Sequence, residues 1–333
     1  MTLFIVVFSL VSCFLIWAVY FITVMPERSY NGSISTLTQQ EKVVRDKLQA
    51  HVLELAENIG ERNLQNYPQL IRSAEYIEQQ LQNYNYQLQS QSFNVAGKTV
   101  RNIIAELPGK KIPSEIIVIG AHYDSVTGSP GANDNGSGVA AMLEIASLLS
   151  KQELARTIRF IGFVNEEPPF TYTTDMGSYN AASQSYKNKE NIIAMYCLET
   201  IGYYSDEAQS QFYPTPLSLF YPDTGNFIAF VSNINSRTLL RQSVKSFREH
   251  ATLPSEGLAG PSWIGAINLS DHWSYWQQGY QALMVTDTAM FRYPYYHTIN
   301  DSKDKIDYHR LAKVTTALEG MLIDVANNGI NRN

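Results

Sequence analysis

The chain contains few cysteines and few charges, and each shortage excludes a class of protein. Only two cysteines, Cys13 and Cys197, occur among the 333 residues, which excludes a disulfide framework and a four-cysteine zinc site. Charged side chains make up 17% of the chain, too few for a disordered protein, whereas 44% of the residues are hydrophobic and suffice for one large core or two small ones. Any metal ion must therefore be bound by histidine and carboxylate side chains.

Basic side chains are also too few for a nucleic-acid-binding protein. The chain has 25 lysines and arginines against 31 aspartates and glutamates, which gives a net charge of -6 and a pI of about 5.6. Binding to a phosphate backbone depends on an excess of positive charge. We therefore expect no nucleic-acid partner.

An apolar run without a charged side chain covers residues 3–25. At about 1.5 Å per residue, a helix of this length is long enough to cross a hydrocarbon core of about 30 Å. We therefore predict one transmembrane helix as an anchor over residues 1–28, a polar linker over 29–38 and a folded domain over 39–333. The expected protein is a single-pass membrane protein whose folded domain lies in the periplasm or outside the cell.

Two other targeting signals compete with this anchor. The Leu-Val-Ser-Cys tetrad at residues 10–13 resembles a bacterial lipobox, but apolar sequence continues beyond Cys13, where a mature lipoprotein turns polar. A cleaved signal peptide has a basic start, an apolar stretch of about 7–15 residues and a small-residue cleavage site. None of these is present. Only Glu27 and Arg28 flank the run, so the positive-inside rule says little about orientation.

The remaining sequence alternates between helical and strand patterns. Apolar residues recur at helical spacing over residues 40–59, after Pro68 and over 307–327. A further helix is predicted over 136–150, and strands are predicted over 86–95, 100–107, 115–120, 157–164 and 192–198. This alternation predicts an α/β fold, a three-layer α/β/α sandwich around a mixed, largely parallel sheet.

Polar side chains follow the predicted strands, where ligands of open α/β sheets bind. His122 and Asp124 come directly after strand 115–120 and, on extended backbone, point to one side. The histidine can bind a metal ion, and the carboxylate can then accept the second ring N–H and orient the imidazole. A glycine-rich loop then carries Asp134 toward the same edge.

Three further carboxylates and a histidine follow in the same way. Glu166 and Glu167 end strand 157–164, Glu199 ends strand 192–198, and His297 lies on an aromatic turn. Each signal alone has an ordinary explanation, such as a surface turn, a satisfied core histidine or a solvated charged pair. Two adjacent carboxylates at the end of an apolar strand are nevertheless costly unless a cation lies nearby. Together, these strand-end signals favour a metal centre.

Six short segments of the chain, taken together and in order, form a recognisable set of motifs. They are G-A-H-Y-D-S at 120–125, G-A-N-D-N-G-S-G-V-A at 131–140, N-E-E at 165–167, L-E-T-I-G at 198–202, S-D-H-W at 270–273 and Y-H-T-I-N-D-S-K-D-K-I-D at 296–307. In kind and order they resemble the di-zinc exopeptidase family of bacterial leucyl aminopeptidases and glutamate carboxypeptidase, of which glutaminyl cyclases are a divergent branch. The resemblance covers roughly residues 40–327.

The resemblance implies a role for each candidate residue. It makes Asp134 the bridge between two Zn²⁺ ions, with His122 and Glu199 completing one site and Glu167 and His297 completing the other. Glu166 would be the general base, and Asp124 the partner that orients His122. Asp271 would lie near the second metal and orient polar groups or receive a substrate amine. The family also implies a cis peptide between Asp134 and Asn135.

The chain departs from the family pattern at two places. The family commonly has aspartate where Glu199 stands, so an extra methylene must be accommodated for this carboxylate to reach the same ion. Residues 168–176 form an insertion next to the predicted metals, which we interpret as a rigid rim over the substrate cleft; a plain surface loop is the alternative.

These features predict a metallo-aminopeptidase that hydrolyses N-terminal bonds of peptide or protein substrates. It would use two Zn²⁺ ions per chain, although other divalent cations suit the same ligands. Two alternatives stay open. One is a single-zinc enzyme that cyclises N-terminal glutamine, and the other is a catalytically inactive binding member of the fold.

Overall fold

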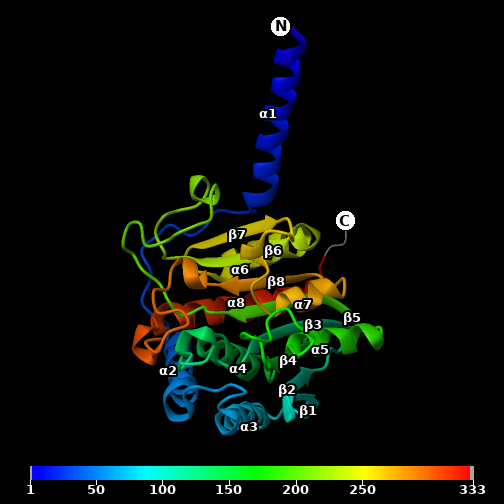
Figure 1. Cartoon of the computed structure of the whole chain (residues 1–333), viewed down its shortest axis with the longest axis vertical. Coiled ribbons are helices and arrows are strands. Elements are labelled where there is room, and N and C mark those ends of the chain that lie inside the picture. Colours follow the sequence, from blue (N-terminus) through cyan, green and yellow to red (C-terminus); the bar gives the residue numbers. More distant parts are fainter. Residues whose placement is uncertain (1, 331–333) are drawn as a thin grey trace.

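The computed structural model describes residues 2–330, which contain one eight-stranded sheet in the order β1-β2-β4-β3-β5-β8-β6-β7 (Figure 1). The strands are β1 Leu88–Val95, β2 Lys98–Leu107, β3 Ile112–His122, β4 Arg156–Phe163, β5 Asn191–Glu199, β6 Ile228–Asn233, β7 Ser255–Gly260 and β8 Ala282–Thr286. The β3–β4, β3–β5, β5–β8 and β6–β7 pairs are parallel. The β1–β2, β2–β4 and β6–β8 pairs are antiparallel, so the sheet is mixed, as predicted.

Helices cover both faces of the sheet and complete three layers. One face packs against α2 Gln39–Leu53, α3 Tyr67–Asn83, α4 Gly138–Leu149, α6 Arg237–His250 and α8 Tyr308–Asn328. The opposite face packs against α5 Gly177–Lys187 and α7 His272–Gln277. The predicted α/β architecture is therefore confirmed.

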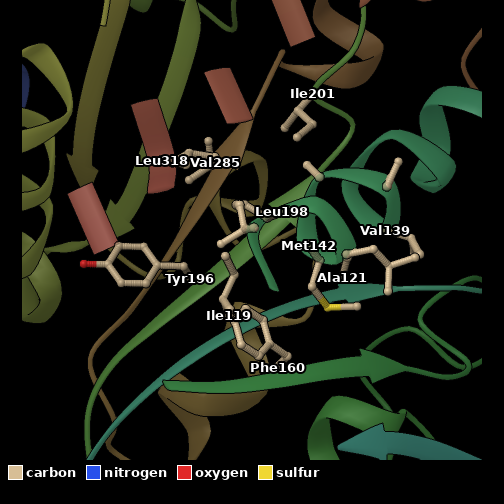
Figure 2. Packing of buried hydrophobic residues seen from close by; sticks show 14 of the residues in the cluster. Ile119, Ala121, Val139, Met142, Phe160, Tyr196, Leu198, Ile201, Val285 and Leu318 are labelled. Carbon is tan, nitrogen blue, oxygen red and sulfur yellow. The ribbon is translucent and has the colours of Figure 1, made fainter. Parts of the chain in front are cut away.

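The central strand β3 shows why the sequence folds this way. Ile117 and Ile119 point into the larger core, and Figure 2 shows Ile119 beside Phe160, its partner on β4. Ile116 and Val118 point into the core on the α5/α7 side. A run of β-branched residues buried on both faces is typical of a central parallel strand. This strand delivers His122 to the carboxyl edge of the sheet.

The helix boundaries follow local capping signals. Thr38 and Glu41 form a capping box at the start of α2, with Glu41 N 3.2 Å from Thr38 Oγ1 and Thr38 N 2.7 Å from Glu41 Oε2. The predicted helix over 40–59 forms as α2 and a π-helical continuation, Glu54–Ile59. At the other end of the chain, the Asp307 carboxylate accepts a hydrogen bond from Arg310 N and begins α8.

The N-terminal segment forms helix α1, Thr2–Thr23, which projects away from the sheet (Figure 1). Among residues 2–330, no helix combines the length and apolar character needed to cross a membrane, so the predicted transmembrane anchor is not supported. The division into 1–28, 29–38 and 39–333 and the periplasmic or extracellular location stay predictions. Met1 and residues 331–333, at the outer ends of this division, lie outside the described residues.

Candidate metal centre

Three neighbouring parallel strands bring the predicted site residues to one edge of the sheet. Strand β3 ends at His122 and β5 ends at Glu199, while Glu166 and Glu167 lie three and four residues beyond the end of β4. Because β3 pairs in parallel with both β4 and β5, these three strand ends lie side by side. The sheet thus brings together residues that lie far apart in the sequence.

Five of the predicted ligands form two clusters that share Asp134. In the first, His122 Nε2 lies 3.3 Å from Asp134 Oδ1 and 3.2 Å from Glu199 Oε2. In the second, His297 Nε2 lies 3.0 Å from Asp134 Oδ2 and 3.2 Å from Glu167 Oε2. Within each cluster, one donor atom from each residue lies within 4.8 Å of the others. The longer Glu199 side chain therefore reaches the first cluster despite its extra methylene.

A tight loop positions Asp134 between the two clusters. Gly131 begins the loop with φ of 63°, and a Cβ there would lie 2.5 Å from the Asp134 carbonyl oxygen, so only glycine fits. Backbone N–H groups of Asn133 and Asp134 donate to the Asp301 carboxylate at 2.8 and 3.1 Å. The Asp134–Asn135 peptide bond is cis, which confirms that prediction.

Asp124 links the histidine of the first cluster to the Glu166–Glu167 pair. Its Oδ1 lies 3.5 Å from Nδ1 of His122, and its carbonyl oxygen lies 3.2 Å from the same nitrogen. Its two carboxylate oxygens accept hydrogen bonds from Glu166 N and Glu167 N, each at 3.2 Å. Asp124 therefore lies where the sequence predicts an orienting group, and it fixes the backbone beside Glu166 as well.

Three residues in or next to the two clusters have a left-handed backbone conformation. Asn165, directly before Glu166, has φ of 59°, Thr200, directly after Glu199, has φ of 41°, and His297 itself has φ of 59°. Non-glycine residues rarely adopt this left-handed region, and such residues tend to occur at functional sites.

The donor atoms fit divalent cations. Nε2 of His122, Oδ2 of Asp134 and Nε2 of His297 are buried without a hydrogen-bond partner among the described residues. Buried polar atoms are costly when they are unpartnered, and imidazole nitrogen and carboxylate oxygen are the donors that zinc accepts. The residues present therefore fit the metal that the sequence predicts.

The charges in the site also call for a cation. Six buried carboxylates surround His122 and His297; they belong to Asp124, Asp134, Glu166, Glu167, Glu199 and Asp271. Burial raises the pKa of Glu167 to about 8, and the negative charge of Asp134 adds to this rise. Burial likewise raises the pKa of Glu166 and of Glu199. In the absence of a cation, the site therefore disfavours the ionised form of these three glutamates.

For the two histidines and the shared Asp134, in contrast, the surroundings favour the charged form. Burial opposes ionisation of His297, but the neighbouring carboxylates of Asp134 and Glu167 outweigh it and raise its pKa to about 10. Burial also opposes ionisation of His122, and the charges of Glu199 and Glu166 outweigh it, so the pKa of His122 is well above its usual value. The two imidazoles in turn lower the pKa of Asp134 against the effect of its burial.

The metal-free protein is therefore expected to lose thermal stability as the pH rises from about 5 to about 9. The pKa of Glu167 is about 8 against a usual 4.5, and that of His297 is about 10 against 6.5, so the folded state keeps protons that the unfolded chain has lost. Melting temperatures of chelator-treated protein across this range measure the effect. Glu167→Gln removes one titration and should make the decline shallower. A melting temperature that rises with pH would contradict the assignment.

Asp271 lies beside the clusters without belonging to either of them. It immediately precedes α7, is fully buried, and neither carboxylate oxygen has a hydrogen-bond partner among the described residues. Burial raises its pKa to about 7, although the nearby charge of His122 opposes the rise. The preceding hydroxyl, Ser270 Oγ, donates to Glu199 Oε2 at 2.7 Å. The segment thus holds Glu199 in place, and Asp271 lies beside His122 and Glu199 of the first cluster. Its role in orienting polar groups or receiving a substrate amine stays a prediction.

The 168–176 insertion contacts the residues around the site. The Thr171 hydroxyl donates to the Glu166 carbonyl oxygen at 2.8 Å. The Tyr172 hydroxyl donates to Asn268 Oδ1 at 3.0 Å, and its ring packs edge-on against Trp273 at 5.0 Å between centroids. These contacts favour a rim next to Glu166 over a plain surface loop.

Two residues near the clusters were not among the predicted site residues. Asp301 holds the loop of Asp134 and also accepts a hydrogen bond from Tyr293 at 2.7 Å. Tyr296 stacks on His297 at 3.9 Å between ring centroids, and burial, followed by the charge of Asp134, raises its pKa. Its hydroxyl therefore stays neutral and can donate a hydrogen bond. Both residues lie inside the 296–307 motif, which was the signal available in the sequence.

Comparison with known proteins agrees with this geometry. The profile of peptidase family M28 matches residues 102–321. The uncharacterized protein YfbL of Escherichia coli (strain K12) is 36% identical over 286 residues, which covers 83% of this chain and 87% of YfbL.

Two solved structures have a similar fold. One is BSAP, a zinc aminopeptidase from Bacillus subtilis, with a TM-score of 0.67, 16% identity and coverage of 85% of this chain and 95% of that chain. The other is Fimbriiglobus ruber glutaminyl cyclase, with a TM-score of 0.61, 18% identity and coverage of 91% and 99%. At these identities the similarity concerns the fold alone. The family match, in contrast, spans more than half of the chain and includes all of the predicted metal ligands, and the chain therefore belongs to peptidase family M28.

Proposed function

We propose that this protein is a zinc-dependent aminopeptidase with Glu166 as its general base. The observation that carries the proposal is the pair of nitrogen and oxygen donor clusters that share Asp134, with the carboxylate of Glu166 beside them. Membership of peptidase family M28 supports action on peptides, and the fold shared with a zinc aminopeptidase supports zinc.

In this proposal, His122, Asp134 and Glu199 hold one cation, and Asp134, Glu167 and His297 hold a second. When bound, the cations lower the pKa of water and polarise the scissile carbonyl group. Glu166 Oε2 lies 3.9 Å from His122 Nε2, so it reaches the edge of the first cluster without being one of its three donors. There it can take a proton from the attacking water and return it to the leaving amine. Asp124 keeps both His122 and Glu166 in place for this transfer.

Glutaminyl cyclisation is the second candidate function, and the fold shared with Fimbriiglobus ruber glutaminyl cyclase is the observation that supports it. A cyclase of the kind weighed above needs one zinc ion. The second cluster, in which His297 lies 3.0 Å from Asp134, supplies donors for a second ion. We therefore favour hydrolysis.

One experiment separates the two functions. The purified protein is given aminoacyl 4-nitroanilides and an N-terminal glutaminyl peptide, and its zinc content is measured. We expect hydrolysis of the anilides, no cyclisation and two zinc ions per chain. A chelator should abolish hydrolysis and added zinc should restore it. Cyclisation with one zinc ion per chain would reverse the assignment, and hydrolysis that persists after complete metal removal would reject the metal mechanism.

A further inference from the structure

A mostly apolar pocket opens beside the predicted metal centre. Glu199 and Tyr296 lie at its metal-centre end. Its floor is formed by β8, β6 and β7, on the face of the sheet that α5 and α7 cover elsewhere. Its walls come from the segments around residues 211–221, 266–269 and 288–291. The pocket therefore lies where a substrate whose scissile bond is at the metals would place a side chain.

The register of the sheet places two glutamates at opposite ends of this floor. Glu199 on β5 pairs with Thr286 on β8, Thr286 pairs with Ala229 on β6, and Ala229 pairs with Glu256 on β7. All four residues line the pocket, so their side chains share one face. Three strand spacings separate Glu199 from Glu256, about 14 Å between backbones. Glu256 therefore lies across the pocket from the metal ligands.

Most polar side chains of the pocket bond to other parts of the protein. Tyr213 and Tyr221 donate to the carbonyl oxygens of Pro222 and Gly257 at 2.7 and 2.8 Å. Gln211 bonds through both ends of its amide, to Thr288 and to Arg292. The tyrosine hydroxyl protons and both ends of the Gln211 amide are thus engaged within the protein, and none of these side chains carries a charge.

Glu256 differs from these residues. It is partly buried, and no hydrogen bond or ion pair of its carboxylate is found among the described residues. Burial raises its pKa, and the charge of Arg248 offsets only part of that effect. The Arg248 guanidinium is already engaged with both Ser255 oxygens and with the carbonyl oxygens of Pro26 and Glu27. Glu256 is therefore the carboxylate in this pocket that a cationic ligand would stabilise.

We propose, on the basis of the aminopeptidase function above, that the pocket binds the side chain of the substrate's N-terminal residue and that Glu256 selects lysine or arginine there. The apolar walls suit the methylene stem of these side chains, and the carboxylate at the far end pairs with their charge. A leucine side chain fits the walls but is too short to reach Glu256. The N-terminal preference thus follows from the strand order, which places β7 three strands from β5.

Matched substrates test the role of Glu256. Norleucine 4-nitroanilide has the stem of lysine without its ammonium group, so the ratio of kcat/KM for lysine to that for norleucine isolates the charge. In the unaltered protein we expect this ratio to exceed about 10. In Glu256→Gln we expect it to fall by about 10- to 100-fold, the range of a partly screened charge pair. Glu249→Gln, an equal charge change at an exposed position of α6, is the matched control.

The outcomes separate this inference from the proposed function. A ratio below 1 in the unaltered protein, or an equal ratio in the unaltered and Glu256→Gln proteins, overturns the lysine and arginine selectivity while hydrolysis of norleucine anilide keeps the aminopeptidase function. Absence of hydrolysis with every anilide overturns both. Because the ratio is measured within one protein sample, a loss of active molecules in the variant does not affect it.

Discussion

Replacing Glu166 with glutamine is expected to lower the kcat for aminoacyl anilides by between about 10² and 10⁴, the range typical of general acid–base catalysis. Glutamine keeps the size of the side chain and removes its ability to take a proton. Glu166 is not one of the three donors in either cluster, so the variant should retain its zinc. Metal analysis of the purified variant, together with steady-state kinetics, measures both quantities.

Glu167→Gln is the matched control for this prediction. The two glutamates are adjacent in the sequence and both are buried, but Glu167 Oε2 lies 3.2 Å from His297 Nε2 within the second cluster. The control should therefore lose both zinc and activity, whereas Glu166→Gln should lose activity alone. Near-normal turnover by Glu166→Gln would remove Glu166 as the base. Loss of zinc from Glu166→Gln would instead place it among the ligands.

The centre of the fold could be predicted from the sequence because local and tertiary preferences agree there. Residues 116–119 are β-branched and are buried on both faces, so the local run predicts a central strand that ends just before His122. The alternation of helix and strand patterns along the chain predicts parallel neighbours for this strand. Glu166 and Glu199 are similarly placed by the ends of apolar strands. The motifs contain histidine and carboxylate side chains of the kind that bind metal ions together. They therefore indicate that these strand ends lie next to one another around one metal centre.

The other half of the sheet could not be predicted in this detail. The sequence of β7, Ser255–Gly260, contains two glycines and a glutamate, which have low strand propensity, and pairing with β6 stabilises it as a strand. The order β5-β8-β6-β7 does not follow the sequence, so no local pattern places Glu256 in the same row as Glu199. The pocket is therefore a product of tertiary structure. Tyr296 lies within a motif, but its stacking on His297 also depends on the folded turn.

Asp134 is the residue on which both clusters depend. Its Oδ1 faces His122 and its Oδ2 faces His297, so one carboxylate contributes a donor to each cluster. The loop that carries it is tied to Asp301 through two backbone hydrogen bonds, and the neighbouring Asn135 donates to the Leu198 carbonyl oxygen at 2.7 Å. Strand β5 and the 296–307 segment therefore position one side chain between the two cations that we propose.

Asp134→Asn is accordingly expected to lower zinc content from two ions to one or none and to abolish measurable hydrolysis. An amide nitrogen cannot replace the second carboxylate oxygen as a donor, and the lost negative charge weakens the hold on both ions. Asp175→Asn, at an exposed position in the neighbouring insertion, loses the same charge and should retain both zinc ions. Zinc counts, activity and melting temperatures of the two variants make the comparison. If Asp134→Asn kept two zinc ions and full activity, the clusters would not share this carboxylate and the two-metal proposal would fail.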